Sequence, residues 1–405
     1  MKFFSWLTLA CCAFLLASCS KEDSLDSVDG MVKTIDSVAM DTQFGLIQLD
    51  DGKYVALSQG YMIKIDAEGR KEWKKKAAEL LYIRGAASLP GTGYILFGVP
   101  SDAPSFSALY ACRYDAEGNF IGGSYFNANS PATYTGVPGN VLRLSNGGYA
   151  IATNSNYTNC ASLRIFDQDF NLDYVQAILP PSGYSVIQIQ DFCELPGGDF
   201  SISSTAGASD YISQWAVVHP YVIQTGPDGR IKSTWMGGDS SHSAIPNVVS
   251  PCQGGYFTVS SNMGAWGGTE GTFVDYYTVT CIAGSLHIDR YNMQGQLTGG
   301  RYITGYPGFG IIHTVHALET GGFILCGTVG NSSSSVTVSK TKIYVCKLDD
   351  ALNEVWSKVI ETTYQAIGVD AVQTADGGFL VSGNLKSFNK NYQMLMIRMD
   401  ENGNF

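Results

Sequence analysis

One phrase recurs along almost the whole chain, and it constrains the fold more than any other feature. An apolar segment runs into a tight turn that contains glycine, and an aromatic residue then opens a second segment of alternating polarity. Gly-Gly and Asp-Gly turns between alternating segments are typical of β-hairpins, because such turns need positive φ angles. The aromatic residues that mark the successive copies are Tyr54, Tyr94, Tyr149, Phe200, Tyr256, Phe323 and Phe379.

A second phrase follows the first in each copy. An alternating segment runs into an acidic turn with glycine, as at Asp66–Gly69 and Asp400–Gly403, and a further strand follows. Two hairpins per unit make four antiparallel strands, which we name A to D from the axis outward. Such a unit repeated seven times is typical of a propeller. We therefore predict an all-β, seven-bladed β-propeller of four-stranded antiparallel blades, with a β-solenoid and six or eight blades as alternatives.

An acidic residue recurs in the turn of the second phrase in six of the units. Because each lies in a different blade, they cannot surround one calcium ion. Aspartate in a turn commonly accepts hydrogen bonds from the backbone amides of that turn, and we predict this structural role here. The residues concerned are Asp66, Asp115, Asp167, Asp228, Asp349 and Asp400.

The two ends of the chain indicate how the ring closes. The last unit stops at Phe405, shortly after its third strand, and so it lacks strand D. The segment Met31–Ile35 alternates in polarity and precedes the first A strand. We predict that this N-terminal strand closes the last blade beside Met394–Met399, because a shared strand removes an open sheet edge.

The two phrases resemble the Gly-Gly-aromatic and Asp-x-x-Gly repeats of secreted bacterial seven-bladed β-propellers, including Bacteroidetes-type surface lipoproteins. The resemblance covers the whole chain after the N-terminal segment. It implies the architecture and leaves the function open, since propellers host many unrelated activities.

The first residues are typical of an export signal. Lys2 is followed by an apolar run, Phe3–Ala17, which is too short to span a bilayer comfortably. Leu16–Cys19 resembles the lipobox of bacterial lipoproteins. The resemblance implies cleavage before Cys19 and a lipid on its thiol, while an ordinary signal peptide and a buried helix are the alternatives.

The next residues predict where the protein goes. Ser20–Asp23 resembles the short Lys-plus-acidic signal that sends Bacteroidetes-type lipoproteins to the cell surface. We expect a lipid-anchored protein of the outer membrane, exposed at the cell surface. The predicted organisation is a signal peptide over residues 1–18, a lipidated flexible tether over 19–30, and the propeller over 31–405.

Composition agrees with this fold and narrows the partners. Apolar residues make up 45% of the chain and charged residues 15%, with 46 glycines and 23 tyrosines, a balance that favours β structure. The net charge of −11 argues against a phosphate-backbone partner and gives no electrostatic help towards anionic lipid. We expect no nucleic-acid partner, a membrane contact through the N-terminal lipid only, and a monomer.

Seven cysteines lie outside the signal and the lipobox, and an odd number leaves at least one thiol free. None has the spacing of a zinc site, and several sit beside branched or aromatic residues. We expect buried thiols that pack as small hydrophobic groups. They are Cys112, Cys160, Cys193, Cys252, Cys281, Cys326 and Cys346.

Motifs for catalysis are lacking. The five histidines form no zinc pattern, and neither a Gly-x-Ser-x-Gly elbow nor a Walker loop occurs. His313 and His316 lie within one predicted A strand, where two-residue alternation places them on opposite faces. We predict no catalytic residue, no metal and no cofactor.

The order of the strands predicts where a ligand would bind. The A–B and C–D turns share one face, and the longer D–A and B–C connections share the other, which we call the long-loop face. Two B–C insertions there, Ala208–Pro220 and Gly264–Thr278, are rich in aromatic residues that suit sugar rings or peptide side chains. The predicted ligand-binding residues are Tyr211, Trp215, His219, Trp266, Tyr276 and Tyr277. The alternative is that these loops pack on each other or extend the strands.

In several units, the D–A connection contains an aromatic residue or a histidine. It lies a similar number of residues before the aromatic anchor of that unit. A ring of tyrosine hydroxyls near the axis could hold a polar ligand, and the alternative is that these side chains pack between blades. The ligand-binding candidates are Tyr184, Tyr306 and Tyr364, with Tyr134 and His242 at matching positions.

From these features we predict a non-catalytic protein that binds a glycan, a peptide or a protein partner through the long-loop face. The first alternative is a propeller glycoside hydrolase or polysaccharide lyase, which would bring two carboxylates, or tyrosine with histidine, into one cleft. The second is a structural accessory subunit of an outer-membrane complex, which would show a flat apolar patch.

Overall fold

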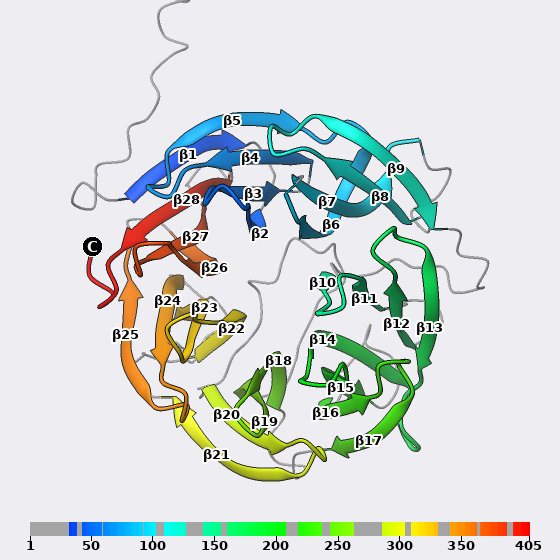
Figure 1. Cartoon of the computed structure of the whole chain (residues 1–405). Coiled ribbons are helices and arrows are strands. Elements are labelled where there is room, and N and C mark those ends of the chain that lie inside the picture. Colours follow the sequence, from blue (N-terminus) through cyan, green and yellow to red (C-terminus); the bar gives the residue numbers. More distant parts are fainter. Residues whose placement is uncertain are drawn as a thin grey trace, which may run out of the picture.

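The computed structural model contains seven four-stranded antiparallel sheets arranged around one axis (Figure 1). It describes residues 32–38, 43–58, 60–91, 93–102, 109–126, 141–154, 160–207, 218–236, 244–262, 286–303, 309–330, 341–362, 365–386 and 392–405. The predicted all-β, seven-bladed propeller is thereby confirmed. Within these ranges, no helix has the length and apolar character needed to cross a membrane.

The strands of a blade follow one another in the chain from the axis outward. Blade 1 consists of β2 (Gln43–Gln48), β3 (Tyr54–Ser58), β4 (Tyr61–Ile65) and β5 (Lys71–Lys76). Blade 2 consists of β6 (Leu80–Leu89), β7 (Gly93–Pro100), β8 (Leu109–Tyr114) and β9 (Phe120–Phe126). Blade 3 consists of β10 (Val141–Arg143), β11 (Tyr149–Asn154), β12 (Ala161–Phe166) and β13 (Leu172–Ile178).

The same order continues through the second half of the ring. Blade 4 consists of β14 (Val186–Glu194), β15 (Phe200–Gly207), β16 (Val218–Thr225) and β17 (Ile231–Met236). Blade 5 consists of β18 (Ala244–Cys252), β19 (Gly255–Asn262), β20 (Leu286–Asn292) and β21 (Leu297–Ile303). Blade 6 consists of β22 (Phe309–Ala317), β23 (Phe323–Gly330), β24 (Thr341–Leu348) and β25 (Glu354–Ile360).

Blade 7 is built from both ends of the chain. Its three inner strands are β26 (Gln365–Gln373), β27 (Phe379–Lys386) and β28 (Tyr392–Met399), and its outer strand is β1 (Val32–Val38). β1 pairs antiparallel with β28, with Val32 opposite Ile397 and Ile35 opposite Met394. The predicted closure is therefore confirmed, and the shared strand ties the two ends of the ring together.

The core lies between neighbouring blades. The recurring aromatic residues are buried in it, and Tyr94, Phe200 and Phe379 are at most 1% exposed. One cluster joins Ile324 and Cys326 of blade 6 to Phe379 and Val381 of blade 7. The anchor of each repeat is thus apolar because the faces of adjacent sheets bury it. In the described part of the chain, Cys112, Cys193, Cys326 and Cys346 are buried, as predicted, whereas Cys160 and Cys252 are half-buried.

The acidic C–D turns have the predicted structural role. Asp115 Oδ1 accepts hydrogen bonds from the backbone N–H groups of Glu117 (2.9 Å) and Asn119 (2.8 Å). The Asn119 side chain donates to Asp115 Oδ2 (2.9 Å). Asp66, Asp167, Asp349 and Asp400 bind backbone N–H groups in the same way, and Asn292 takes this place in blade 5. Asp228 lies two positions later in its turn and accepts the N–H of Arg230 (3.1 Å).

The tryptophans of the outer strands explain the glycine of the same turns. Trp73 of β5 lies against Gly118 in the C–D turn of blade 2, and a Cβ at that position would lie 2.6 Å from the ring. Gly118 also has a φ of +73°, which side chains rarely adopt. Trp356 of β25 lies against Gly403 of blade 7 in the same manner. Each of these turns therefore receives a ring from the preceding blade.

Six A strands share a β-bulge. The register of their pairing with strand B skips one residue, and that residue lies nine or ten positions before the aromatic anchor. The skipped residues are Phe44, Arg84, Gln190, Asn247, His313 and Val369. A bulge interrupts the alternation of side chains along a strand and re-aims the residues beside it.

Candidate functional site

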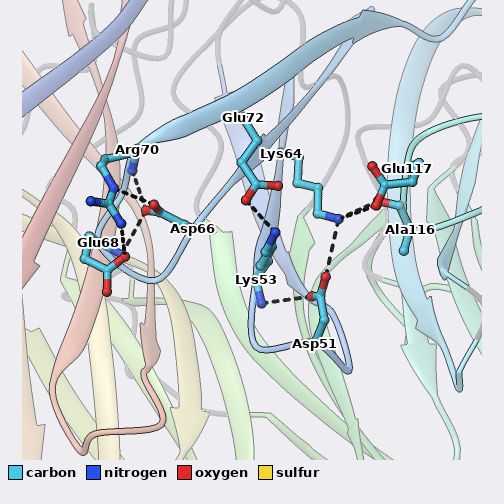
Figure 2. Close-up of polar contacts among 9 residues, drawn as sticks. All are labelled: Asp51, Lys53, Lys64, Asp66, Glu68, Arg70, Glu72, Ala116 and Glu117. Carbon is cyan, nitrogen blue, oxygen red and sulfur yellow. Dashed lines mark hydrogen bonds and ion pairs between the residues drawn. The ribbon is translucent and has the colours of Figure 1, made fainter.

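Charged groups at the tight-turn face form contacts between blades 1 and 2. Lys64 lies near the tight-turn face between blades 1 and 2, and its side chain is 1% exposed. Its Nζ atom lies 3.3 Å from Asp51 Oδ2 and 3.1 Å from Glu117 Oε1, and it donates to the Ala116 carbonyl (2.9 Å) (Figure 2). The charged groups drawn there hold turns and blades together, so this face is engaged in structural contacts.

Two predicted ligand-binding residues, Tyr184 and His219, lie in the described part of the chain. The other seven fall outside it and remain predictions, as does the lipidation of Cys19. These seven are Tyr211, Trp215, Trp266, Tyr276, Tyr277, Tyr306 and Tyr364. The matching Tyr134 and His242 also lie outside the described ranges.

Tyr184 and His219 come together on the long-loop face of blade 4. Their ring centroids are 5.4 Å apart at an angle of 76°, an edge-to-face contact. Tyr184 belongs to the turn before β14, where its N–H donates to the Pro181 carbonyl (3.0 Å). His219 lies opposite Ala206 within β16, which begins at Val218, so strand structure starts inside the predicted insertion. Both side chains are half-buried.

The environment of Tyr184 is compatible with both interpretations of the tyrosines. The ring packs at the edge of the apolar cluster between blades 3 and 4. At the same time, part of the side chain remains accessible beside the histidine. The pair offers an aromatic surface and an imidazole to the solvent side of the blade.

A second polar group lies where strand A of blade 6 faces blade 7. His316 Nε2 lies 2.7 Å from Asp370 Oδ1, and 44% of the histidine side chain is exposed. Asp370 itself is 3% exposed. Its Oδ2 accepts the N–H of Leu46 (3.1 Å) in blade 1, and its Oδ1 also accepts the N–H of Ala371 (2.9 Å). A fixed, buried carboxylate therefore orients an accessible imidazole.

The protonation of this pair follows from its surroundings. Crowding by the protein lowers the pKa of His316, but the charge and hydrogen bond of Asp370 outweigh it, so the pKa lies above its ordinary value. The charge of Asp191 acts in the same direction. Burial raises the pKa of Asp370, and the interactions with His316 outweigh this effect and hold the pKa below its ordinary value. The pair therefore favours imidazolium with carboxylate.

His313 and His316 lie on the same face of β22, and the prediction of opposite faces is wrong. His313 Nε2 lies 3.2 Å from Thr328 Oγ1. Thr328 stands opposite Ile343, which packs in the cluster between blades 6 and 7. His316 reaches blade 7 directly through Asp370. The reason is the bulge at His313, which inserts a residue and breaks the two-residue alternation.

The carboxylate position has a counterpart in blade 4. Asp191 also follows a bulge, its Oδ1 accepts the N–H of Phe192 (2.8 Å), and its Oδ2 accepts the N–H of Val249 (2.9 Å) in blade 5. Asp191 and Asp370 each lie nine positions before their anchors, Phe200 and Phe379. Aligning the repeats could have found this pair of aspartates, but the contact of Asp370 with a histidine of another blade has no local signal.

A third group lies at the edge of blade 5, and the sequence did not indicate it. His287 Nδ1 lies 3.1 Å from Asp289 Oδ1. The rings of His287 and Tyr302 are 4.7 Å apart in an edge-to-face contact, and Tyr302 is 62% exposed. Gly300 leaves room for them, since a Cβ there would lie 2.6 Å from His287 Cε1.

None of these groups has the composition of a metal centre. Among the residues that the structure describes, no three His, Cys, Asp or Glu side chains come together in a way that could hold a metal ion. The chemistry available at the described sites is hydrogen bonding, proton exchange at imidazole and contact with aromatic rings.

No protein-family model and no curated protein matches this chain. Among solved structures, it is similar to a protein of unknown function from Dyadobacter fermentans (11% identity, TM-score 0.50, 91% of this chain and 98% of that one). It is also similar to polysaccharide lyase PL25, an ulvan lyase (10% identity, TM-score 0.57, 91% and 96%). A protein of unknown function from Bacteroides caccae aligns more loosely (9% identity, TM-score 0.39, 91% and 92%). At such identities the likeness concerns the fold alone.

Proposed function

We propose that this protein is an exported lipoprotein that binds a glycan, a peptide or a protein partner through its long-loop face and performs no chemistry of its own. Cys19 would carry the lipid and hold the propeller at the outer membrane, facing the cell surface. The proposal combines the N-terminal motifs with the contact between Tyr184 and His219 on the long-loop face.

One observation carries the binding part of the proposal. Tyr184 and His219, predicted independently from a D–A connection and from the B–C insertion, are in ring contact on blade 4. A half-exposed aromatic ring with an adjacent imidazole suits a sugar face with its hydroxyl groups, or a planar peptide side chain. On the opposite face, charged groups such as Lys64 are engaged between blades.

A glycan-array screen with residues 20–405 tests this proposal. This fragment keeps every strand from β1 to β28. We expect saturable binding without turnover, and a loss of at least tenfold in affinity in the variant Tyr184→Ala/His219→Ala, about 1.4 kcal/mol or more. The matched control is His287→Ala/Tyr302→Ala, which removes a ring pair of the same kind from blade 5. Equal loss in both variants, with unchanged melting temperatures, would contradict the placement of the site on blade 4.

The anchor is tested separately in cells. We expect the wild-type protein from the membrane fraction to begin at Cys19 and to carry the added mass of a lipid there, and the variant Cys19→Ser to carry none. A wild-type protein with an unmodified Cys19 would contradict the lipoprotein assignment.

The His316–Asp370 pair favours a second candidate, a propeller glycoside hydrolase or polysaccharide lyase. A buried carboxylate that orients an accessible imidazole is the arrangement of a general base or acid. The array ligands should therefore be incubated with the protein and examined for new reducing ends or unsaturated products. Cleavage by the wild type that is abolished in His316→Ala would replace the binding function with this one.

A further inference from the structure

The outer strand of blade 1 differs in charge from every other described outer strand. β5 has the sequence KEWKKK, with four lysines and one glutamate. The other six outer strands, β9, β13, β17, β21, β25 and β1, carry at most one lysine or arginine each. In a protein with a net charge of −11, this is a strong local reversal.

Three of these lysines form what we call the basic strip: Lys71, Lys74 and Lys76. Lys71 and Lys76 are exposed, and Lys74 is half-buried with its ammonium 4.7 Å from the centre of the Tyr61 ring. The fourth, Lys75, contacts the next blade, where it donates to the Glu117 carbonyl (2.6 Å) and to Asn119 Oδ1 (2.9 Å). The strip is thus a feature of the rim, and Lys75 links it to blade 2.

Exposed apolar side chains lie on the rim of the next blade. β9 begins directly after Asn119, and its residues Phe120 and Ile121 are 44% and 58% exposed. The basic strip lies on the other face of β5, because Lys71 and Lys74 pair with Ile65 and Ile63, which pack against blade 7. Figure 1 shows β5 and β9 following each other around the outer edge of the ring. Lysines that share a rim with accessible aromatic and aliphatic side chains are typical of surfaces that enter the headgroup region of a bilayer.

The start of the described chain lies beside this rim. β1 is the outer strand of blade 7 and pairs with β28. Met394 and Met396 of β28 pack with Ile63 and Ile65 of blade 1, so blades 7 and 1 are neighbours. From Val32 back to Cys19 there are 13 peptide units, which reach at most about 45 Å when fully extended. A lipid on Cys19 would therefore hold the start of β1 within about 45 Å of the bilayer.

We propose that the basic strip, together with Phe120 and Ile121, docks the rim of blades 1 and 2 on an anionic lipid surface. The net charge alone predicts the lipid as the only membrane contact, and the position of β5 points to a second one. Salt confines the repulsion of the remaining negative charge to about 8 Å, so the strip acts locally and turns this rim towards the membrane.

This inference rests on the proposed lipid anchor only for the distance between the strip and the bilayer. Its test uses residues 20–405, which lack the cysteine and retain all strands. Co-sedimentation is measured with vesicles of equal parts phosphatidylcholine and phosphatidylglycerol, and with pure phosphatidylcholine. We expect binding to the anionic vesicles that weakens as salt is raised.

The decisive variant is Lys71→Gln/Lys74→Gln/Lys76→Gln. Each lysine near an anionic surface contributes about fivefold in affinity, so binding should fall by about a hundredfold. The matched control, Lys232→Gln/Lys342→Gln/Lys358→Gln, removes the same number of positive charges from blades 4 and 6. It should bind like the wild type. Melting temperatures confirm that both variants are folded.

Three results would overturn the docking surface. The first is equal binding to anionic and neutral vesicles, the second is an equal loss in the two triple variants, and the third is an absence of wild-type binding. None of them affects the lipoprotein proposal, which the lipid on Cys19 decides.

Discussion

Blades 4 and 7 place the same carboxylate at the same point of strand A, and they use it differently. Asp191 and Asp370 each follow a bulge, and each accepts an N–H from the A strand of the next blade, at Val249 and Leu46. At Asp370, the ring of His316 joins these contacts at 2.7 Å. The comparison separates the contact that joins neighbouring blades, present at both aspartates, from the contact of Asp370 with the imidazole of His316.

The largest expected effect concerns the shared role. Asp191→Ala and Asp370→Ala each leave two backbone N–H groups without a carboxylate acceptor, at about 1 to 3 kcal/mol per group. We expect each variant to lower the free energy of unfolding by about 3 kcal/mol in urea denaturation, with the two losses close to each other. A loss in Asp370→Ala far beyond that in Asp191→Ala would mean that the histidine is part of the structural role.

The next effect sharpens the difference between the two blades. We expect Asp370→Asn to lower the pKa of His316, because the variant removes the charge that holds this pKa above its ordinary value. Asp191→Asn should lower it less, since its charge makes the smaller contribution. NMR titration of the histidine ring protons measures both, with His219 and His287 as internal controls. Equal decreases in the pKa of His316 in the two variants would mean that Asp370, which contacts the ring, has no larger effect than the distant Asp191.

The smallest expected effect is the loss of the contribution that His316 makes to the free energy of unfolding. His316→Gln should cost less than about 1 kcal/mol at neutral pH, because a side chain that is 44% exposed forms a solvent-screened ion pair. The raised pKa makes this contribution fully present below the unfolded pKa of about 6.5, and it is lost as pH rises through the folded value. The difference between wild type and variant should therefore shrink in denaturation curves from about pH 6 to about pH 9.

The stability contributed by Asp370 has the opposite pH dependence. The lowered pKa of Asp370 contributes stability that is present above its unfolded value of about 3.9 and is lost as pH falls through the folded value. We expect Asp370→Asn to narrow its stability deficit in urea denaturation as pH falls below about 4. A deficit that stays constant over this range would indicate that folding does not shift the pKa of this carboxyl group.

Much of the fold was predictable because its determinants are local. The turn that precedes Tyr149, Leu144 to Gly148, closes with bonds between residues a few positions apart, as does the acidic turn at Asp115. Hydrophobic and aromatic residues at a fixed place in each unit, such as Tyr94, then become the core between blades. The lack of a fourth strand at Phe405 and the alternating segment at the other end indicated the closure, which the pairing of Val32 with Ile397 confirms.

The candidate site was predictable only in part, because its contacts join distant residues. Tyr184 and His219 were both predicted, yet their ring contact depends on where the connection before β14 lies relative to β16. His316 and Asp370 are 54 positions apart and belong to different blades. A two-residue alternation cannot represent a bulge, and so it misplaced His313 relative to His316.

The sequence by itself determined the repeat, the turns, the aromatic anchors and the strand that closes the ring, because each depends on periodicity and on backbone conformations that a few neighbouring residues set. Only the tertiary structure decided that Asp370 orients His316, that His287 meets Tyr302, and that the lysines of β5 lie on the rim of a blade next to the one that contains β1. Those outcomes depend on bulges, on the packing of adjacent blades and on ring closure, which bring together residues that no local pattern connects.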